Sequence, residues 1–313
     1  MEAQRWDRIK VIFSKAAEKP VPERAAFLDQ ACSGDSALRR EVEKLLGQLA
    51  QTETVDIFAT QPRHALQRGD VLADRFRILR FIGKGGMGEV YEANDQELGG
   101  PVALKILKPG LIGDAQFLGR FRREVQLARQ VTHPNVCRVF DVGHDRSFDQ
   151  ERVFITMELL DGETLADHLL QSGRLSTDAA LPLITQMADG LDALHQKGII
   201  HRDFKPANVL VIQSASGTSR AVISDFGLAR ALDPDTSITN LSRASHILGT
   251  PDYMAPEQLL GAPVTHAADI YALGLVMYEM VTGKKAFPGG RALENAVQRV
   301  VEQPSPPQEH SAG

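Results

Sequence analysis

The chain has 313 residues, a formal net charge of −5 at pH 7, 43% hydrophobic residues and 24% charged residues. This hydrophobic share is ample for a packed core, and the negative net charge argues against a nucleic-acid-binding surface. The two cysteines, Cys32 and Cys137, lie far apart, so we expect no disulfide framework and a cytoplasmic location. No apolar run reaches the roughly 18 residues of a membrane-spanning helix, and no signal peptide is expected.

The start of the chain is predicted to form a small helical module at residues 1–60, followed by a linker at residues 61–75. Asp35 or Ser36 can act as an N-cap within this module. The helical patterns that support it lie at residues 6–17, 22–31 and 35–49.

A glycine-rich segment follows, ahead of two apolar, β-branched runs. Glycines let the backbone approach phosphates closely. A dinucleotide-binding fingerprint would need a helix after the glycines, whereas this chain continues into strand-like residues 90–93 and 102–107. We therefore expect a flap over a nucleotide that joins two strands. Its assigned residues are Ile82, Gly83, Lys84, Gly85, Gly86, Met87, Gly88 and Val90.

Lys105 lies inside the second of these strands, where its charge would be costly to bury unless it is paired. A solubilising lysine on an edge strand is the alternative. Glu124, in the helical pattern of residues 117–127, is the candidate partner, and a solvated helix charge is the competing interpretation.

Two more helical patterns span residues 178–198 and 265–283, with Thr265 as a cap and Gly283 as a stop for the second. Asp269 lies within the second pattern. A carboxylate there must find hydrogen-bond donors or become protonated, unless it is a solvated acid of the first turn.

Two short segments, His-Arg-Asp-Phe-Lys-Pro-Ala-Asn and Ser-Asp-Phe-Gly, carry the strongest chemical signal. Phosphoryl transfer builds charge on oxygens, so catalysis needs positioning and cations more than covalent chemistry. Asp203 can orient and deprotonate a hydroxyl, and Lys205 can neutralise the moving phosphoryl group. Asn208 and Asp225 offer the oxygen ligands that Mg²⁺ prefers. The pattern predicts phosphoryl transfer from ATP.

These segments resemble the catalytic loop and the metal-binding loop of protein kinases. The resemblance runs from about Phe76 to about Val301, with further motifs in the family's order. The leader and the glycine-loop variant are similar to those of bacterial, eukaryotic-like (Hanks-type) serine/threonine kinases. The resemblance implies an α+β, bilobal fold with ATP between the lobes, and Mg²⁺ (or Mn²⁺) held by Asn208 and Asp225.

In this fold the N-lobe, residues 76–157, is an antiparallel β-sheet with one helix, and the mainly helical C-lobe spans residues 158–301. Residues 302–313 are expected to be a disordered tail. The family normally has three more helices after residue 288, and here only residues 291–301 offer one. We therefore expect a short C-lobe that lacks the last helices, together with the arginine that in the family pairs with the glutamate matching Glu257.

The resemblance also implies roles for individual residues. Lys105 would contact the α- and β-phosphates and pair with Glu124, and Asp269 would hold the catalytic-loop backbone. Ordinary core packing is the alternative for each apolar residue of the adenine pocket. The residues implied for adenine are Val90, Ala103, Met157, Glu158, Leu160 and Leu210.

A loop rich in Ser and Thr, between Asp225 and Glu257, resembles an activation segment. Arg202 can pair with a phosphorylated residue of this loop, although such a composition also suits a disordered loop. Lys205 and Thr250 are features of serine/threonine kinases rather than tyrosine kinases. The candidate regulatory hydroxyls are Thr236, Thr239, Ser242 and Ser245.

Two functions therefore compete. The first is a serine/threonine protein kinase that transfers phosphate to protein hydroxyls, autophosphorylates its loop and forms a homodimer for that reaction in trans. The second is a catalytically silent or truncated kinase-fold scaffold that binds nucleotide or partners without turnover. Intact catalytic residues favour the first, and the missing helices favour the second.

Overall fold

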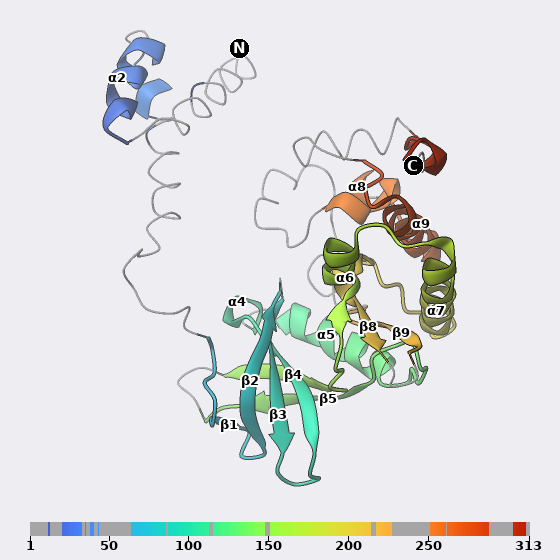
Figure 1. Ribbon diagram of the computed structural model, residues 1–313. Helices are drawn as coiled ribbons and strands as arrows, with labels where there is room; N and C mark the ends of the chain where they lie inside the picture. The colour runs from blue at the N-terminus through green and yellow to red at the C-terminus, as the bar shows by residue number, and fades with distance from the viewer. Residues whose placement is uncertain are drawn as a thin grey trace. The chain divides into compact units, whose positions relative to one another are not determined.

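The computed structural model describes residues 12, 21–32, 35, 38–40, 43, 64–85, 87–112, 115–147, 151–213, 217–226, 251–260, 262–287 and 303–310. The chain divides into two compact units, Met1–Arg63 and His64–Gly313. Figure 1 shows most strands of the second unit gathered in one lobe and most of its helices in another.

The described part of the first unit is helical. Helix α2 spans Val21–Cys32, and Leu28 and Cys32 are buried on it. Asp35 accepts the N–H of Leu38 at 2.9 Å, which is the bond that an N-cap makes. Arg39 forms an ion pair with Asp29 of α2 and thereby links α2 to the helical residues that follow it.

The N-lobe is a six-stranded sheet in which every neighbouring pair is antiparallel, with the order β1-β2-β3-β4-β6-β5. Buried and more exposed residues alternate along β3, as expected when one face of a sheet covers a core. The strands are β1 (Val71–Leu72), β2 (Phe76–Lys84), β3 (Gly88–Asp95), β4 (Pro101–Leu107), β5 (Val139–Asp145) and β6 (Arg152–Met157).

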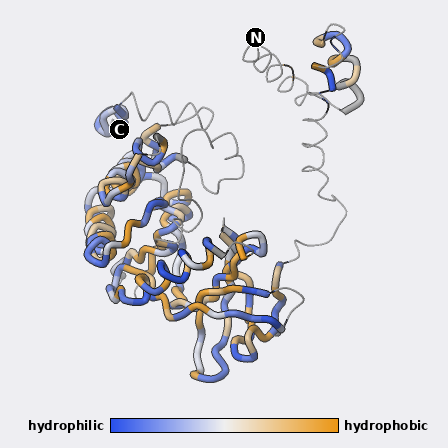
Figure 2. The backbone as a smooth tube through the Cα atoms, turned by 180° about the vertical axis from the view of Figure 1, so that it is seen from behind, coloured by the Kyte–Doolittle hydropathy of each residue, from blue (hydrophilic) through white to orange (hydrophobic). Residues whose placement is uncertain are grey.

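One long helix, α5 (Ala115–Ala128), belongs to this lobe, and Phe117, Phe121 and Val125 are buried along it. We expected a single helix, and the structure adds one helical turn before it, α4 (Pro109–Ile112). Figure 2 shows hydrophobic and hydrophilic stretches alternating along the described backbone, as expected where each element buries one face.

The expected linker at residues 61–75 differs from the structure. Residues 64–75 belong to the second compact unit. Leu66 and Leu72 are buried in the N-lobe core, and β1 pairs with β2. The segment is part of the folded N-lobe rather than a linker, because it supplies two buried leucines and the strand β1.

The C-lobe is mainly helical, and α7 packs on α9 and on β9. Thr265 caps α9 and Gly283 ends it with a φ of 69°, both as expected from the sequence. The elements are β7 (Glu163–Thr164), α6 (Leu165–Ser172), α7 (Thr177–His195), η1 (Pro206–Asn208), β8 (Val209–Gln213), β9 (Ser219–Ile223), η5 (Pro251–Tyr253), α8 (Pro256–Leu260), α9 (His266–Thr282) and η6 (Pro307–His310).

The expected disordered tail at residues 302–313 is ordered over residues 303–310, where Pro307–His310 forms the 3-10 helix η6. The His310 ring lies edge-on to the Tyr278 ring of α9, with 6.1 Å between centroids. This aromatic contact places η6 against α9. The helix expected at residues 291–301 lies outside the described residues. None of the helices that the structure describes is long and apolar enough to cross a membrane.

Candidate active site

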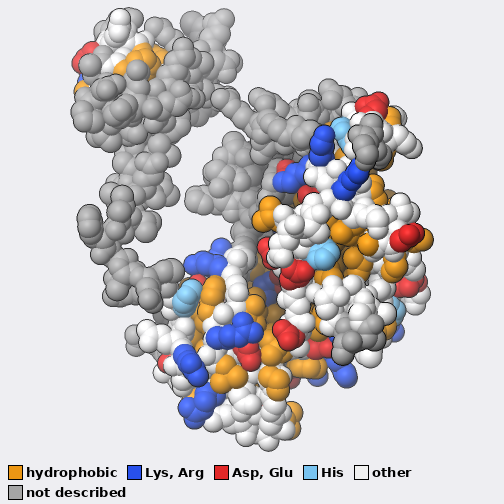
Figure 3. Space-filling model, in the orientation of Figure 1, with side chains coloured by type: hydrophobic (Ala, Val, Ile, Leu, Met, Phe, Trp, Pro, Cys, Tyr) orange, Lys and Arg blue, Asp and Glu red, His pale blue; other side chains and the backbone are white. Residues whose placement is uncertain are grey.

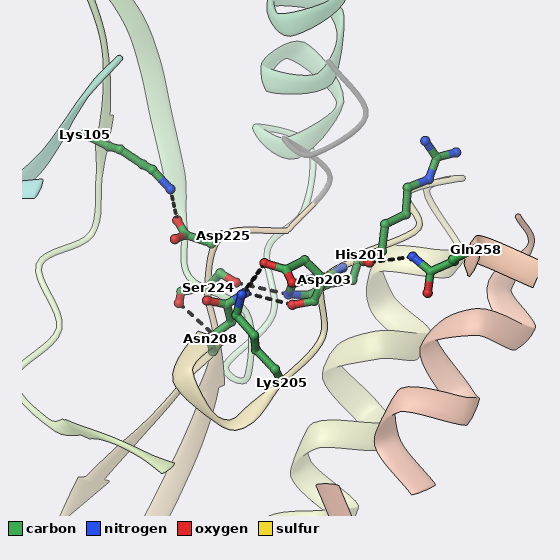
Figure 4. Close-up of polar contacts among 9 residues, drawn as sticks. Lys105, His201, Asp203, Lys205, Asn208, Ser224, Asp225 and Gln258 are labelled. Carbon is green, nitrogen blue, oxygen red and sulfur yellow. Dashed lines mark hydrogen bonds and ion pairs between the residues drawn. The ribbon is translucent and has the colours of Figure 1, made fainter. Parts of the chain in front are cut away.

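Lys105 is 3% exposed and lies on β4, whose neighbours are β3 and β6. Because β4 is a central strand, Lys105 is not a solubilising residue of a sheet edge. Its Nζ atom lies 2.7 Å from Oδ1 of Asp225, and Figure 4 shows this ion pair bridging the two lobes. The structure thus places the buried ammonium group against a candidate metal ligand.

Asp225 follows β9 with a φ of 60°, in the left-handed region that non-glycine residues rarely adopt. Burial raises the pKa of its carboxyl group, but the charge and hydrogen bond of Lys105, together with the nearby His201 and Lys205, hold the pKa below its ordinary value. Asp225 is therefore ionised at neutral pH. The ion pair that we expected for Lys105 was with Glu124. The structure pairs Lys105 with Asp225 instead, and Glu124 lies half-buried on α5.

The catalytic-loop residues converge on one carboxylate. Lys205 Nζ lies 2.7 Å from Oδ2 of Asp203. The side-chain nitrogen of Asn208 donates to the carbonyl of Asp203 at 2.8 Å and to its Oδ2 at 3.2 Å. The Asp203 side chain is 32% exposed, so it remains accessible to a substrate hydroxyl.

The orientation of Asn208 bears on metal binding. Its amide nitrogen faces two oxygens of Asp203, so its amide oxygen is the atom available to a cation. Among the described residues, no group of three or more His, Cys, Asp and Glu could hold a metal. An amide oxygen and a carboxylate suit Mg²⁺, which usually takes one or two protein ligands beside phosphates and waters. Asn208 and Asp225 fit that chemistry.

Asp269 binds the backbone of the catalytic loop. It is fully buried on α9 and accepts the backbone N–H groups of His201 and Arg202, each at 2.8 Å. His195 at the end of α7 donates from Nε2 to the same carboxylate at 2.8 Å. Burial raises the pKa of Asp269, but these donors outweigh it and hold the pKa low. The prediction that Asp269 supports this backbone is confirmed.

His201 connects the catalytic loop to the metal-binding loop. Its ring is fully buried, and burial lowers its pKa, so the imidazole is neutral. Nε2 lies 3.1 Å from the carbonyl of Ser224 and must carry the proton, because a carbonyl only accepts. Ser224 in turn donates its N–H to the carbonyl of Asn208 at 2.8 Å. Both candidate magnesium ligands are thereby tied to one framework.

Sequence reasoning missed three residues of this framework. His195 and His201 were not singled out, and neither was Gln258, which donates to the carbonyl of Arg202 at 2.7 Å. Arg202 has a φ of 67°, so its backbone is strained. The sequence could have identified His201, because His201 is the first residue of the catalytic motif. No sequence pattern points to Gln258, whose contact with Arg202 spans 56 residues of chain.

The residues predicted to sandwich adenine share one face of the sheet. Val90 is opposite Lys105, and Ala103 is opposite Met157 in the strand register. Residues that face each other in a ladder point to the same side. Leu210 lies half-buried on β8 of the C-lobe.

The segment after β6 offers backbone groups at the same place. The N–H of Glu158 donates to the carbonyl of Arg138 at 2.9 Å, so its carbonyl is the group that can receive a ligand. Cys137 Sγ lies 3.8 Å from that carbonyl, and burial raises the pKa of this thiol to about 12. Leu160 is half-buried two residues further on.

The glycine-rich segment divides into two parts. A Cβ atom added at Gly83 or Gly85 meets nothing within 4 Å. A Cβ atom at Gly88 would lie 1.7 Å from the carbonyl oxygen of Ile106. Met87 is buried in the core. Gly88 and Met87 therefore serve packing, while Gly83 and Gly85 keep the backbone open to a ligand.

The remaining predicted residues are distributed as follows. Ile82 is 42% exposed, and Lys84 forms an ion pair with Glu89. Figure 3 shows charged side chains of both signs mixed with hydrophobic ones over the two lobes. The predicted residues outside the described ranges are Gly86, Thr236, Thr239, Ser242, Ser245 and Thr250.

The chain is similar to known proteins. The family model of the protein kinase domain matches residues 76–310. The chain is 43% identical over 219 residues to the serine/threonine-protein kinase pkn2 of Myxococcus xanthus, covering 70% of this chain and 26% of that protein. It is 39% identical over 239 residues to the serine/threonine-protein kinase PknA of Mycobacterium tuberculosis, covering 76% and 54%. The chain thus spans about a quarter to half the length of these relatives.

Solved structures agree. A crystal structure of a double mutant of the Mycobacterium tuberculosis PknI kinase domain matches with a TM-score of 0.61 and 28% identity, covering 79% of this chain and 85% of that one. The single mutant of that domain matches with a TM-score of 0.59 and 29% identity, covering 79% and 84%. The chain therefore belongs to the protein kinase domain family, which accounts for its antiparallel sheet, its helical lobe and the residues between them.

Proposed function

We propose that the chain is a serine/threonine protein kinase, which transfers the γ-phosphoryl group of ATP to Ser and Thr hydroxyls of proteins. The observation that carries the proposal is the convergence of Lys205 and Asn208 on the carboxylate of Asp203. Relatives at 43% and 39% identity are named serine/threonine-protein kinases, which supports this class of acceptor.

Each residue has a distinct task in the reaction. Asp203 accepts the proton of the attacking hydroxyl and aims its oxygen at the phosphorus. Lys205 is held beside Asp203, where it neutralises charge on the moving phosphoryl group. Bound magnesium ions would neutralise charge on the phosphate oxygens. Asn208 and Asp225 are the residues that would hold them.

Lys105 and the glycine-rich hairpin would hold the rest of the nucleotide. Because Lys105 is already desolvated, its ammonium group loses little further hydration when phosphate oxygens approach it. Val90, Ala103 and Met157 supply an apolar face for adenine. The carbonyl of Glu158 and the backbone of Leu160 supply its polar contacts.

Regulation by loop phosphorylation forms part of the proposal. Arg202 directly precedes Asp203, and its backbone N–H donates to Asp269. A phosphorylated loop residue paired with Arg202 would therefore act on the catalytic loop directly. Autophosphorylation in a homodimer would supply that phosphate.

The silent-scaffold alternative is not favoured, because the residues that carry the chemistry are present and those described are assembled. The test uses γ-labelled ATP with Mg²⁺, a generic protein substrate, and the Asp203→Asn variant as the control. We expect label on Ser and Thr with the unsubstituted chain and a loss of at least a thousandfold in Asp203→Asn. Equal labelling by both chains would overturn the assignment of Asp203.

A further inference from the structure

The glycine-rich hairpin has two faces. Val90 and Lys105 face the proposed nucleotide site, and strand alternation turns Glu89 and Tyr91 to the opposite face. On that opposite face lie residues 64–66, which we name the upstream strap. Leu66 of the strap is 2% exposed and packs in the same cluster as Tyr91. The hairpin is therefore covered from behind by chain that precedes the kinase sheet.

One buried carboxylate fastens the strap to the hairpin. Glu89 is 9% exposed and accepts the backbone N–H of Ala65 at 2.9 Å and the hydroxyl of Tyr91. Lys84 Nζ lies 3.2 Å from its other oxygen. The N–H of Leu66 donates to the hydroxyl oxygen of Tyr91 at 3.1 Å. Glu89 thus connects three segments: the strap, β3 and the end of β2.

These bonds lie at the base of the glycine-rich loop. Lys84 and Glu89 are opposite each other, as the last pair of the ladder between β2 and β3. Immediately beyond them, Gly85 donates its N–H to the carbonyl of Gly88 at 2.8 Å. His64 of the strap also stacks on Phe81 of β2, with 4.0 Å between ring centroids. Movement of the strap would therefore shift the loop at its base.

We propose that Glu89 is a positioning residue for ATP, which couples the upstream strap to the glycine-rich loop. The strap begins at His64, directly after the last residue of the N-terminal unit. The strap is thus the first stretch of the second compact unit, and Glu89 joins it to the loop. The proposal rests on the proposed function, because it assigns the loop to ATP.

Glu89 interacts with three donors at once: Ala65, Tyr91 and Lys84. A buried carboxylate that loses a donor retains its desolvation cost without the compensating bond. Glu89 therefore keeps the strap, Tyr91 and Lys84 in place together. When one of them moves, the others lose their common acceptor.

The test compares Glu89→Gln with Glu92→Gln in the full chain. Glu92 forms the matched ion pair of the same hairpin, facing Arg80 in the register at 2.6 Å. Exposure is similar, at 63% and 11% for the side chains of Lys84 and Glu89 against 64% and 19% for Arg80 and Glu92. In Glu89→Gln we expect the Kd for Mg²⁺-ATP to rise about tenfold, with kcat changed less than twofold. In Glu92→Gln both quantities stay within twofold.

A second variant perturbs the strap alone. Ala65→Pro removes the N–H that Glu89 accepts, and we expect it to raise the Kd for Mg²⁺-ATP in the same way. Combined with Glu89→Gln it should add little, because both variants weaken the same set of bonds around residue 89. An unchanged Kd in either single variant would overturn the proposal.

Amide hydrogen exchange separates this proposal from the proposed function. Glu89→Gln should speed exchange at Ala65 and Gly85 relative to Glu92→Gln, whether or not the chain turns over ATP. If the unsubstituted chain bound no Mg²⁺-ATP, the proposed function would fail while the exchange experiment still decided the coupling. Unchanged exchange at both amides would refute the coupling.

Discussion

Replacement of Asp269 by asparagine should destabilise the C-lobe strongly. Asp269 accepts three hydrogen bonds, from His195, His201 and Arg202, and its side chain is fully buried. Asparagine has one oxygen and one NH₂ group in place of two oxygens, so one backbone N–H must face a donor. Leaving that N–H buried without an acceptor costs about 1–3 kcal/mol, and losing the charge weakens the other bonds.

We therefore expect Asp269→Asn to lower the free energy of unfolding by about 3 kcal/mol, out of a typical total of about 5–15 kcal/mol. For a domain of this size, that loss lowers Tm by about 6–12 °C. Phosphoryl transfer should fall as well, because Asp269 supports the backbone beside Asp203. Urea unfolding followed by circular dichroism measures the first effect, and a γ-labelled ATP assay measures the second.

The matched control is Asp192→Asn. Asp192 lies on α7 and accepts a hydrogen bond only at the surface, from Gln196 at 2.6 Å. Surface changes of this kind cost about 0.5 kcal/mol or less. If Asp269→Asn were as stable as the Asp192 control, the three bonds to Asp269 would not be what holds the catalytic loop.

Three further predictions concern the N-lobe and its ion pair. Arg75 holds the pKa of buried Asp95 at about 2, below the unfolded value. The stabilisation by the Arg75–Asp95 pair is therefore complete above about pH 4 and is lost as the pH falls toward 2, by about 2 kcal/mol in total. Acid unfolding of Asp95→Asn should lack this pH-dependent loss of stability. An acid-unfolding profile equal to that of the unsubstituted chain would contradict the prediction. Ala73 and Asp74 have φ values of 52° and 53°, so Ala73→Asn with Asp74→Gly should stabilise the domain by about 1 kcal/mol in urea unfolding, and destabilisation would show that the strain is not there. Lys105→Met should abolish phosphoryl transfer while the fold survives by circular dichroism, and retained turnover would refute the role of Lys105.

The sequence predicted what is encoded locally. Asp203, Lys205 and Asn208 lie within six residues of chain, so their chemistry follows from spacing alone. The glycine-rich hairpin and the caps of α9 have equally local signals. The family pattern then ordered these parts into two lobes, which the comparisons confirm.

The rest depends on contacts across the fold. Which carboxylate reaches Lys105 is set by the placement of α5 and of the turn after β9, and no local pattern fixes either. Residues 64–75 were predicted as part of a linker because two buried leucines, Leu66 and Leu72, give no periodicity. The packing role of Gly88 depends on a carbonyl 18 residues further along the chain.

The tight approach of β3 to β4 at Gly88 changes how substitutions in the glycine-rich loop must be interpreted. Any side chain at this position would wedge the two strands apart, since backbone stands where its Cβ would be. Val90 and Lys105 are the facing pair two residues further on, so the wedge would displace the ammonium group from Asp225. A variant at Gly88 would then register in an assay as weak nucleotide binding, although the damage lies in the sheet. Variants at Gly83 report on the ligand itself, and the two glycines are not equivalent probes of one loop.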